Sequence, residues 1–166
     1  MEAAQGAGIW KALTCRAAAV AIVAVGVGTL ALAHEGATGV VKDRMDLMKQ
    51  QQKDMKLIGE MAKGKRPFDS AKAADAARDI SLTAQKIREL FPEGSDGHPS
   101  DALPLIWQEW DRFTSSAKDL GSAADTLASS LEGNKQNWKA AFQKVTDACK
   151  SCHEDFRAKE AEHDQH

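Results

Sequence analysis

Cys149-Lys150-Ser151-Cys152-His153 is the stretch of this 166-residue chain that says most about its fold. At this spacing two thiols can bond covalently to the vinyl groups of haem while the adjoining imidazole binds the iron. On a helix, residues at i, i+3 and i+4 project from the same side. The motif therefore predicts a helix that presents Cys149, Cys152 and His153 on one face and carries one covalent haem.

Two other kinds of site use paired cysteines. A structural zinc site needs two further Cys or His ligands at close spacing, and the chain has no second Cys-x-x-Cys or His-x-x-x-His pair. A thioredoxin-like redox pair lies beside a βαβ unit, whereas the alternating apolar pattern of strands is missing from this sequence. The motif therefore favours haem.

Apolar residues recur at helical intervals in four stretches, at about 38–62, 69–91, 104–132 and 134–156. Thr38 and either Asp69 or Ser70 are the expected caps of the first two helices. Four amphipathic helices predict an all-α protein, an antiparallel four-helix bundle with haem attached to the C-terminal helix.

The third stretch has the most regular pattern, so we expect one unbroken helix there. Gly121 inside it costs about 1 kcal/mol relative to Ala and suggests a kink or a close helix contact. The apolar stripe consists of Ile106, Trp110, Phe113, Ala117, Leu120, Ala124, Leu127 and Leu131.

Residues 1–33 differ from the rest of the chain. Lys11 and Arg16 precede the apolar run 17–33, which ends in the small-x-small sequence Ala31-Leu32-Ala33. A permanent membrane anchor is the alternative, but the run is short, rich in Ala and Gly, and followed by no stop-transfer charges. We predict a cleaved signal peptide over 1–33, a bundle domain over 34–166, a periplasmic location, and no stable membrane anchor after cleavage.

The predicted mature segment has a mildly acidic balance. Residues 1–33 hold two of the 22 Lys and Arg residues and one of the 24 Asp and Glu residues, which leaves a formal net charge of −3. This balance offers no strongly basic face for nucleic acid. Cys15 is removed with the signal, so the remaining cysteines are those of the haem motif and no structural disulfide is expected.

Several of these features together resemble the class II c-type cytochromes, which comprise the high-spin cytochromes c′ and their low-spin, methionine-ligated relatives. The features are the C-terminal Cys-x-x-Cys-His, the Phe156-Arg157 that follows it, and Val40-Val41-Lys42-Asp43-Arg44 leading to Met48. The resemblance covers nearly the whole predicted mature chain and also includes Gly64-Lys65, Ile106-Trp107 and the region from Gly133 to Arg157.

The resemblance implies a second iron ligand. In that family the residue four positions after the first-helix arginine faces the distal side of the iron, and it is apolar in high-spin members and Met in the low-spin branch. Met48 holds that position, so the resemblance implies His153/Met48 ligation. Met45 is the fallback ligand, and Met55 is expected to pack in the core.

Arg44 and Arg157 are the candidate contacts to the haem periphery. Arg44 lies one turn before Met48, and a buried arginine needs an anionic partner, which a haem propionate would provide. Arg157, one turn after His153, is a candidate for a contact near the proximal ligand or a propionate. For both, an ordinary surface position is the alternative. Aromatic residues expected in the core or around haem are Trp107, Trp110, Trp138, Phe142 and Phe156; His34, His98, His163 and His166 are expected in solvent.

The sequence as a whole predicts a periplasmic electron-transfer protein with one six-coordinate His/Met haem c. Its expected partners are redox proteins, no enzyme activity is expected, and the resemblance suggests a homodimer. The main alternative is a high-spin protein that binds or sequesters nitric oxide or carbon monoxide. A haem-free periplasmic helical bundle with a role in metal handling or stress is the third interpretation.

Overall fold

The computed structural model describes residues 36–133 and 137–159. The predicted signal peptide over 1–33 lies outside the described residues, as do His34, His163 and His166. The helices are α1 (Gly39–Ala62), α2 (Ser70–Lys86), the 3-10 turn η1 (Ile87–Leu90), α3 (Leu105–Gln108), α4 (Trp110–Glu132) and α5 (Trp138–Phe156). Within the described ranges, none of these helices has the length and apolar character needed to cross a membrane.

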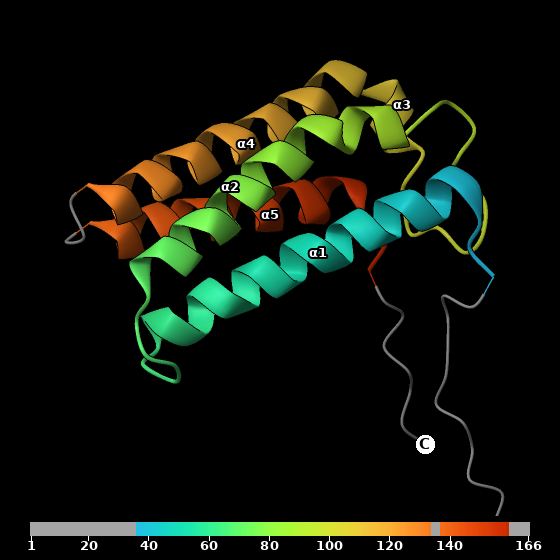
Figure 1. Ribbon diagram of the computed structural model, residues 1–166. Helices are drawn as coiled ribbons and strands as arrows, with labels where there is room; N and C mark the ends of the chain where they lie inside the picture. Colours follow the sequence, from blue (N-terminus) through green and yellow to red (C-terminus); the bar gives the residue numbers. More distant parts are fainter. Residues whose placement is uncertain (1–35, 134–136, 160–166) are drawn as a thin grey trace, which may run out of the picture. The chain divides into compact units, whose positions relative to one another are not determined.

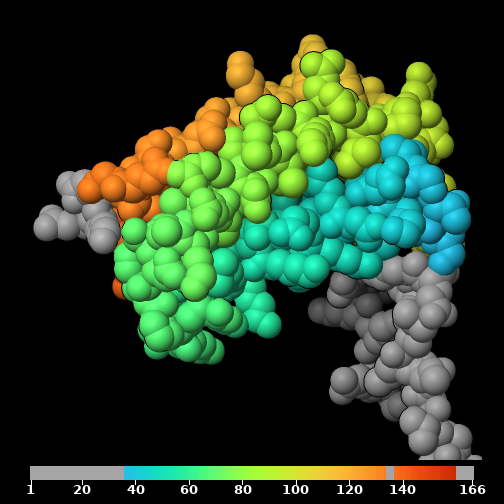
Figure 2. All heavy atoms as spheres, in the orientation of Figure 1, coloured from blue at the N-terminus to red at the C-terminus, as the bar shows by residue number. Residues whose placement is uncertain are grey.

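The four long helices α1, α2, α4 and α5 form an antiparallel bundle (Figure 1), which confirms the predicted fold class. The most extensive packing joins α2 to α4, followed by α4 with α5 and α1 with α2. Contacts between α1 and α5 are few by comparison. Figure 2 shows α1 and α2 lying along one another on one face of the bundle.

The close packing of α2 on α4 follows from the small residues on the inner face of α2. Its buried positions include Ala73, Ala77 and Ala84, which let the neighbouring helix approach. Across the interface, a Cβ placed on Gly121 would lie 3.7 Å from the Cβ of Ala84, and α4 continues through this glycine. The close contact expected at Gly121 is therefore the one α4 makes with α2.

The prediction of one unbroken third helix is wrong. The backbone leaves the helical region at Glu109 (φ −121°, ψ 46°), which separates the single turn α3 from α4. Ile106 is 1% exposed, and the Trp107 indole N–H donates to the Phe91 carbonyl at 3.0 Å. The single turn α3 thus buries Ile106 and bonds to Phe91, while the apolar stripe stays on the core side in both pieces, so periodicity could not reveal the break.

The other predicted helix ends are close to those observed. Asp69 caps α2 by accepting a hydrogen bond from the Lys72 backbone N–H at 3.1 Å. Thr38 precedes α1 in an extended conformation, but its side chain makes no capping hydrogen bond. The second α-helix ends at Lys86, short of the expected end at Phe91, and continues as the 3-10 turn η1. The start expected for the fourth helix at Asn134 lies outside the described residues, and α5 begins at Trp138.

Candidate haem-binding site

The haem motif occupies the last two turns of α5. Cys149 and Cys152 are free thiols, both partly buried, and both pack against the hydrophobic core. His153 follows directly and is exposed. All three residues lie on α5, and the helical spacing projects their side chains from one side of it.

Burial shifts the pKa values of the three side chains of the motif. It raises the pKa of Cys149, and together with Cys149 and Asp155 it raises the pKa of Cys152 to about 11. A redox-active Cys-x-x-Cys pair requires a lowered thiol pKa, so the site does not fit thioredoxin-like chemistry. Desolvation, followed by the positive charge of Arg157, lowers the pKa of His153 and favours the neutral imidazole that binds metals. Among the residues that the structure describes, no three His, Cys, Asp or Glu side chains gather as metal ligands.

The contact between Gly59 of α1 and Phe142 of α5 sets the register of these two helices. A Cβ on Gly59 would lie 3.5 Å from Cζ of Phe142. Met48 precedes Gly59 by eleven residues, and His153 follows Phe142 by eleven residues. Because the two helices are antiparallel (Figure 1) and eleven residues make about three turns, helix geometry predicts that Met48 and His153 lie at about the same level, on the facing sides of α1 and α5.

The three methionines of α1 that were considered as ligands differ in their surroundings. Met48 and Met55 are partly buried and pack against the core, whereas Met45, also partly buried, lies outside that cluster. Met55 is two turns further along α1 than Met48. Met48 is therefore the one that combines the level of His153 with the facing side of α1.

The Arg44 side chain is 4% exposed, so it is not a surface arginine. Its guanidinium donates to the Ser95 carbonyl, to the Ser95 hydroxyl at 3.1 Å and to the Ser100 hydroxyl at 2.6 Å. It also lies over the Phe91 ring, 4.7 Å from the centroid. Burial lowers the pKa of Arg44, and the nearby charge of Asp96 opposes this shift. These groups surround the guanidinium, and its predicted contact with a propionate stays a prediction.

Arg157 follows the end of α5 and is exposed. Its guanidinium pairs with the Asp101 carboxylate at 3.1 Å, and its backbone pairs with Ala102. This end of α5 is thereby joined to the segment before α3. The predicted contact of Arg157 with haem stays a prediction.

The aromatic residues proposed for the core or haem wall lie at both ends of α5. Trp138 stacks on Phe68 with centroids 5.1 Å apart, and Phe142 lies against Gly59. At the other end, Phe156 is 3% exposed and packs edge-on against Phe113. Trp110 lies beside the same Phe113 ring at 5.6 Å.

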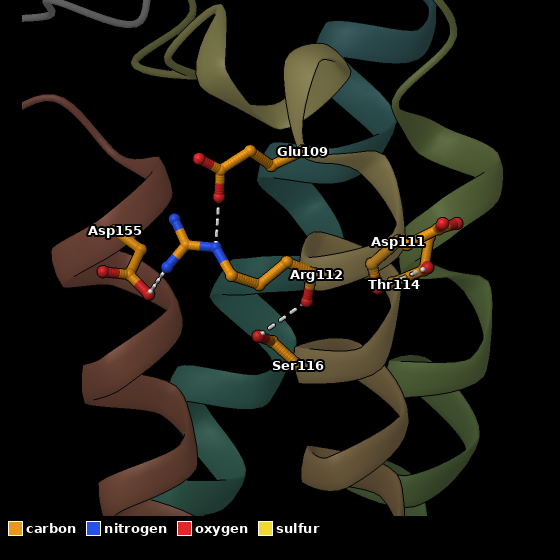
Figure 3. A network of polar contacts seen from close by, with 6 residues as sticks. All are labelled: Glu109, Asp111, Arg112, Thr114, Ser116 and Asp155. Carbon is orange, nitrogen blue, oxygen red and sulfur yellow. Dashed lines mark hydrogen bonds and ion pairs between the residues drawn. The ribbon is translucent and has the colours of Figure 1, made fainter.

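Sequence reasoning missed a group of charged residues beside the haem motif. Figure 3 shows Arg112 of α4 between Glu109 and Asp155, with the Asp155 carboxylate 2.9 Å from its Nη1. The same guanidinium lies 4.7 Å from the centroid of the Phe156 ring. Asp155 is 43 residues from Arg112, and no spacing rule connects positions so far apart. The network holds α4 to the last turn of α5.

A bundle with a Cys-x-x-Cys-His motif on its last helix defines a class of protein, the four-helix-bundle cytochromes with covalent haem. The model of the cytochrome c′ family matches residues 39–157. The chain therefore belongs to the cytochrome c′ family of class II c-type cytochromes, and it carries haem c covalently bound through Cys149 and Cys152.

Relatives with two different names are similar to this chain. A cytochrome c-556 of Agrobacterium tumefaciens (strain II Chrys) is 35% identical over 73% of this chain and 98% of its own length. A cytochrome c′ of Rhodopseudomonas palustris is 35% identical over 75% of this chain and 85% of its own. The solved structure of a cytochrome c′ from Rhodopseudomonas palustris matches with a TM-score of 0.70 and 33% identity, over 75% of this chain and all of that one. Because both relatives are 35% identical to this chain, sequence identity does not show whether the chain is more like the protein named cytochrome c-556 or the one named cytochrome c′.

Proposed function

We propose that this cytochrome is a periplasmic electron carrier in which His153 and Met48 bind the haem iron from opposite sides. The observation that carries the proposal is the contact of Gly59 with Phe142, between two helices that pack sparsely. Counted from this contact, helix geometry puts Met48 level with His153 on facing sides of α1 and α5. The haem-free interpretation is removed by the family membership.

The residues of the site have distinct tasks in this proposal. When bound, haem c supplies an iron centre that gains and loses one electron. Cys149 and Cys152 hold it to α5, and the neutral imidazole of His153 is suited to one axial position. The thioether of Met48 would occupy the other, so that no position stays open for a substrate or gas. Such a site favours electron transfer with docked redox proteins over enzyme catalysis.

The location and assembly of the protein belong to the same proposal. The cleaved signal over 1–33 would deliver the chain to the periplasm, where redox proteins are its partners. The homodimer implied by the class II resemblance stays a prediction. Sedimentation of the mature holoprotein over a range of concentrations would test the assembly.

The test of the ligand set is the optical spectrum of the mature holoprotein, oxidised and reduced, with and without carbon monoxide. We expect a low-spin spectrum that carbon monoxide leaves unchanged. Met48→Leu, which removes the thioether at nearly constant volume, should give a high-spin spectrum that shifts with the gas. Met55→Leu is the matched control and should keep the wild-type spectrum. If Met45→Leu changes the spectrum and Met48→Leu does not, the ligand has been assigned to the wrong methionine.

Gas binding is the second candidate function. It is favoured by the relative named cytochrome c′, which is as similar to this chain as the relative named cytochrome c-556. Under this alternative the Met48 side chain would not stay on the iron, and the wild-type protein would be high-spin. A wild-type spectrum that already responds to carbon monoxide would replace the electron-carrier proposal with this one.

A further inference from the structure

The loop 92–103 is attached at one end to the turn of α1 that precedes Met48. The attachment is the buried guanidinium of Arg44, which donates to the Ser95 carbonyl and to the hydroxyls of Ser95 and Ser100. The Ser100 hydroxyl also accepts a hydrogen bond from the Ala102 N–H at 3.0 Å. Arg44 therefore connects α1 to the backbone of the loop over a distance of 51 to 56 residues in sequence.

The other end of the same loop is attached to the last turn of α5. The Leu103 N–H donates to the Phe156 carbonyl at 3.0 Å, and the Ala158 N–H donates to the Asp101 carbonyl at 2.8 Å. The Arg157–Asp101 ion pair lies beside these bonds. The loop thus contacts both the helix that carries Met48 and the helix that carries His153.

A row of aromatic rings forms a parallel connection through the interior. Phe91, beneath the Arg44 guanidinium, packs edge-on against Phe113 with centroids 4.8 Å apart. Phe113 in turn packs edge-on against Phe156 at 5.4 Å. All three rings are buried, between 2% and 8% exposed. Arg112 covers the far end of the row at Phe156.

These connections matter because direct packing between α1 and α5 is sparse. The contact at Gly59 and Phe142 lies about 16 Å along the bundle from the level of Met48 and His153, at 1.5 Å per residue. The separation of the two ligand-bearing turns must therefore be held by something other than that contact. The loop 92–103 and the rings of Phe91, Phe113 and Phe156 join those turns, and we call them together the brace.

We propose that the brace sets the distance between Met48 and His153, and that Arg44 is the positioning residue that attaches α1 to it. This inference rests on the proposed His153/Met48 ligation. It gives Arg44 a role that requires no contact with haem. Loosening the brace would let the Met48 turn move away from α5 and weaken the thioether ligand, with Met48 itself unchanged.

The experiment uses the holoprotein and two single variants that loosen the brace at different points. Ser100→Ala removes the hydroxyl shared by Arg44 and Ala102, and Arg44→Met removes the guanidinium while keeping an unbranched side chain. We expect carbon monoxide to shift the spectrum of both variants at concentrations that leave the wild type unchanged, and Arg44→Met to respond at a concentration about tenfold or more below the highest at which the wild type shows no shift, because the gas competes with a weakened ligand. Arg44→Lys keeps the charge without the planar fork and should recover only part of the wild-type behaviour.

Matched controls separate the brace from general loss of stability. Ser122→Ala removes a hydroxyl that donates a hydrogen bond within α4, to the Lys118 carbonyl at 3.1 Å. Arg78→Met removes an arginine of α2 that pairs with Asp75 and Glu132 on the surface. Leu127→Ala removes a fully buried side chain of α4 outside the brace and lowers the unfolding temperature. None of the three should change the affinity for carbon monoxide.

A second readout makes the inference independent of the ligand assignment. Amide hydrogen exchange of residues 152–156 of α5 should become faster in Arg44→Met, although Arg44 lies on α1, while residues 120–131 of α4 keep their wild-type rates. If the wild type is low-spin and Arg44→Met changes neither gas affinity nor exchange in α5, the brace is refuted and the ligand assignment stands. If the wild type is high-spin, the ligand assignment fails, and exchange in α5 alone decides whether Arg44 couples the two helices.

Discussion

Gln51 of α1 donates a hydrogen bond of 3.0 Å to the hydroxyl of Thr83 on α2, and the glutamine is only 6% exposed. A polar pair in the interior is directional, since a shifted register would leave its atoms without partners. The pair lies one turn along α1 from Met48. It therefore helps hold the Met48 turn at a defined position against α2.

The Gln51–Thr83 pair gives the first prediction. Gln51→Ala should lower the free energy of unfolding by about 1–3 kcal/mol, because it removes both the hydrogen bond and buried packing. The adjacent Gln52 is exposed, and Gln52→Ala should change stability by less than about 0.5 kcal/mol. Unfolding of the holoprotein in guanidinium chloride measures the free energy of unfolding of both variants. Equal effects of the two variants would show that the pair does not stabilise the α1–α2 contact.

Asp54 should make stability depend on pH in the acid range. Asp54 is only 7% exposed, and burial raises its pKa above the ordinary value of 3.8. A hydrogen bond from Gln50 lowers the pKa in part, and the negative charge of Asp79 raises it further. A raised pKa means that the folded state holds the proton more tightly than the unfolded state. The contribution of Asp54 is therefore most favourable below 3.8 and is lost as pH rises through the folded pKa.

Asp54→Asn removes this titration and keeps a side chain that can bond Gln50. We expect the variant to be more stable than the wild type at pH 7, with the difference shrinking toward pH 3. The measurement is the free energy of unfolding against pH for both proteins. Asp46→Asn on the exposed side of α1 is the control, and its difference from the wild type should follow the opposite trend, because the Lys42 contact lowers the pKa of Asp46. If the stability difference between Asp54→Asn and the wild type is constant with pH, the pKa of Asp54 is not raised in the folded state.

Gly59 should tolerate a methyl group but no larger side chain. A Cβ there meets the Phe142 ring at 3.5 Å, an ordinary contact distance, and Ala is favoured over Gly inside a helix by up to about 1 kcal/mol. Gly59→Ala should therefore raise the unfolding temperature without changing the spectrum. Gly59→Leu should force α1 away from Phe142 and destabilise the protein.

The comparison for Gly59 is Gly64, which has a φ of +69°. Gly64→Ala should be destabilising, since an L side chain is strained in that conformation. Thermal unfolding followed by circular dichroism distinguishes these variants. Destabilisation by Gly59→Ala would mean that α1 and α5 are packed more tightly at this point than the contact distance implies.

Arg112 should contribute modestly to stability, in spite of its several contacts. Its ion pairs with Glu109 and Asp155 are exposed, and such pairs are worth about 0–1 kcal/mol each. Its packing over Phe156 adds about 0.5–1 kcal/mol at a site of this exposure. Arg112→Met should therefore cost about 1 kcal/mol, and part of the loss should vanish at 1 M salt. A loss that salt does not reduce would assign the effect to packing over Phe156 alone.

Periodicity predicted most of the fold because a helix is a local structure. The bounds of α1 and the cap of α2 at Asp69 came close to those observed, since each depends on residues within one or two turns. The break at Glu109 escaped prediction for the same reason. The apolar stripe continues across it, and the cause is tertiary, the burial of Ile106 and the hydrogen bond of Trp107 to the Phe91 carbonyl.

The sequence by itself determined that the chain carries covalent haem, because that chemistry needs two thiols at a spacing fixed within one helix. It also singled out Met48 and Arg44, through a family resemblance. Only the tertiary structure decided that Arg44 bonds Ser95 and Ser100, and that Phe91, Phe113 and Phe156 form one row. These contacts join residues tens of positions apart, and the packing of whole helices, which no local pattern encodes, brings them together.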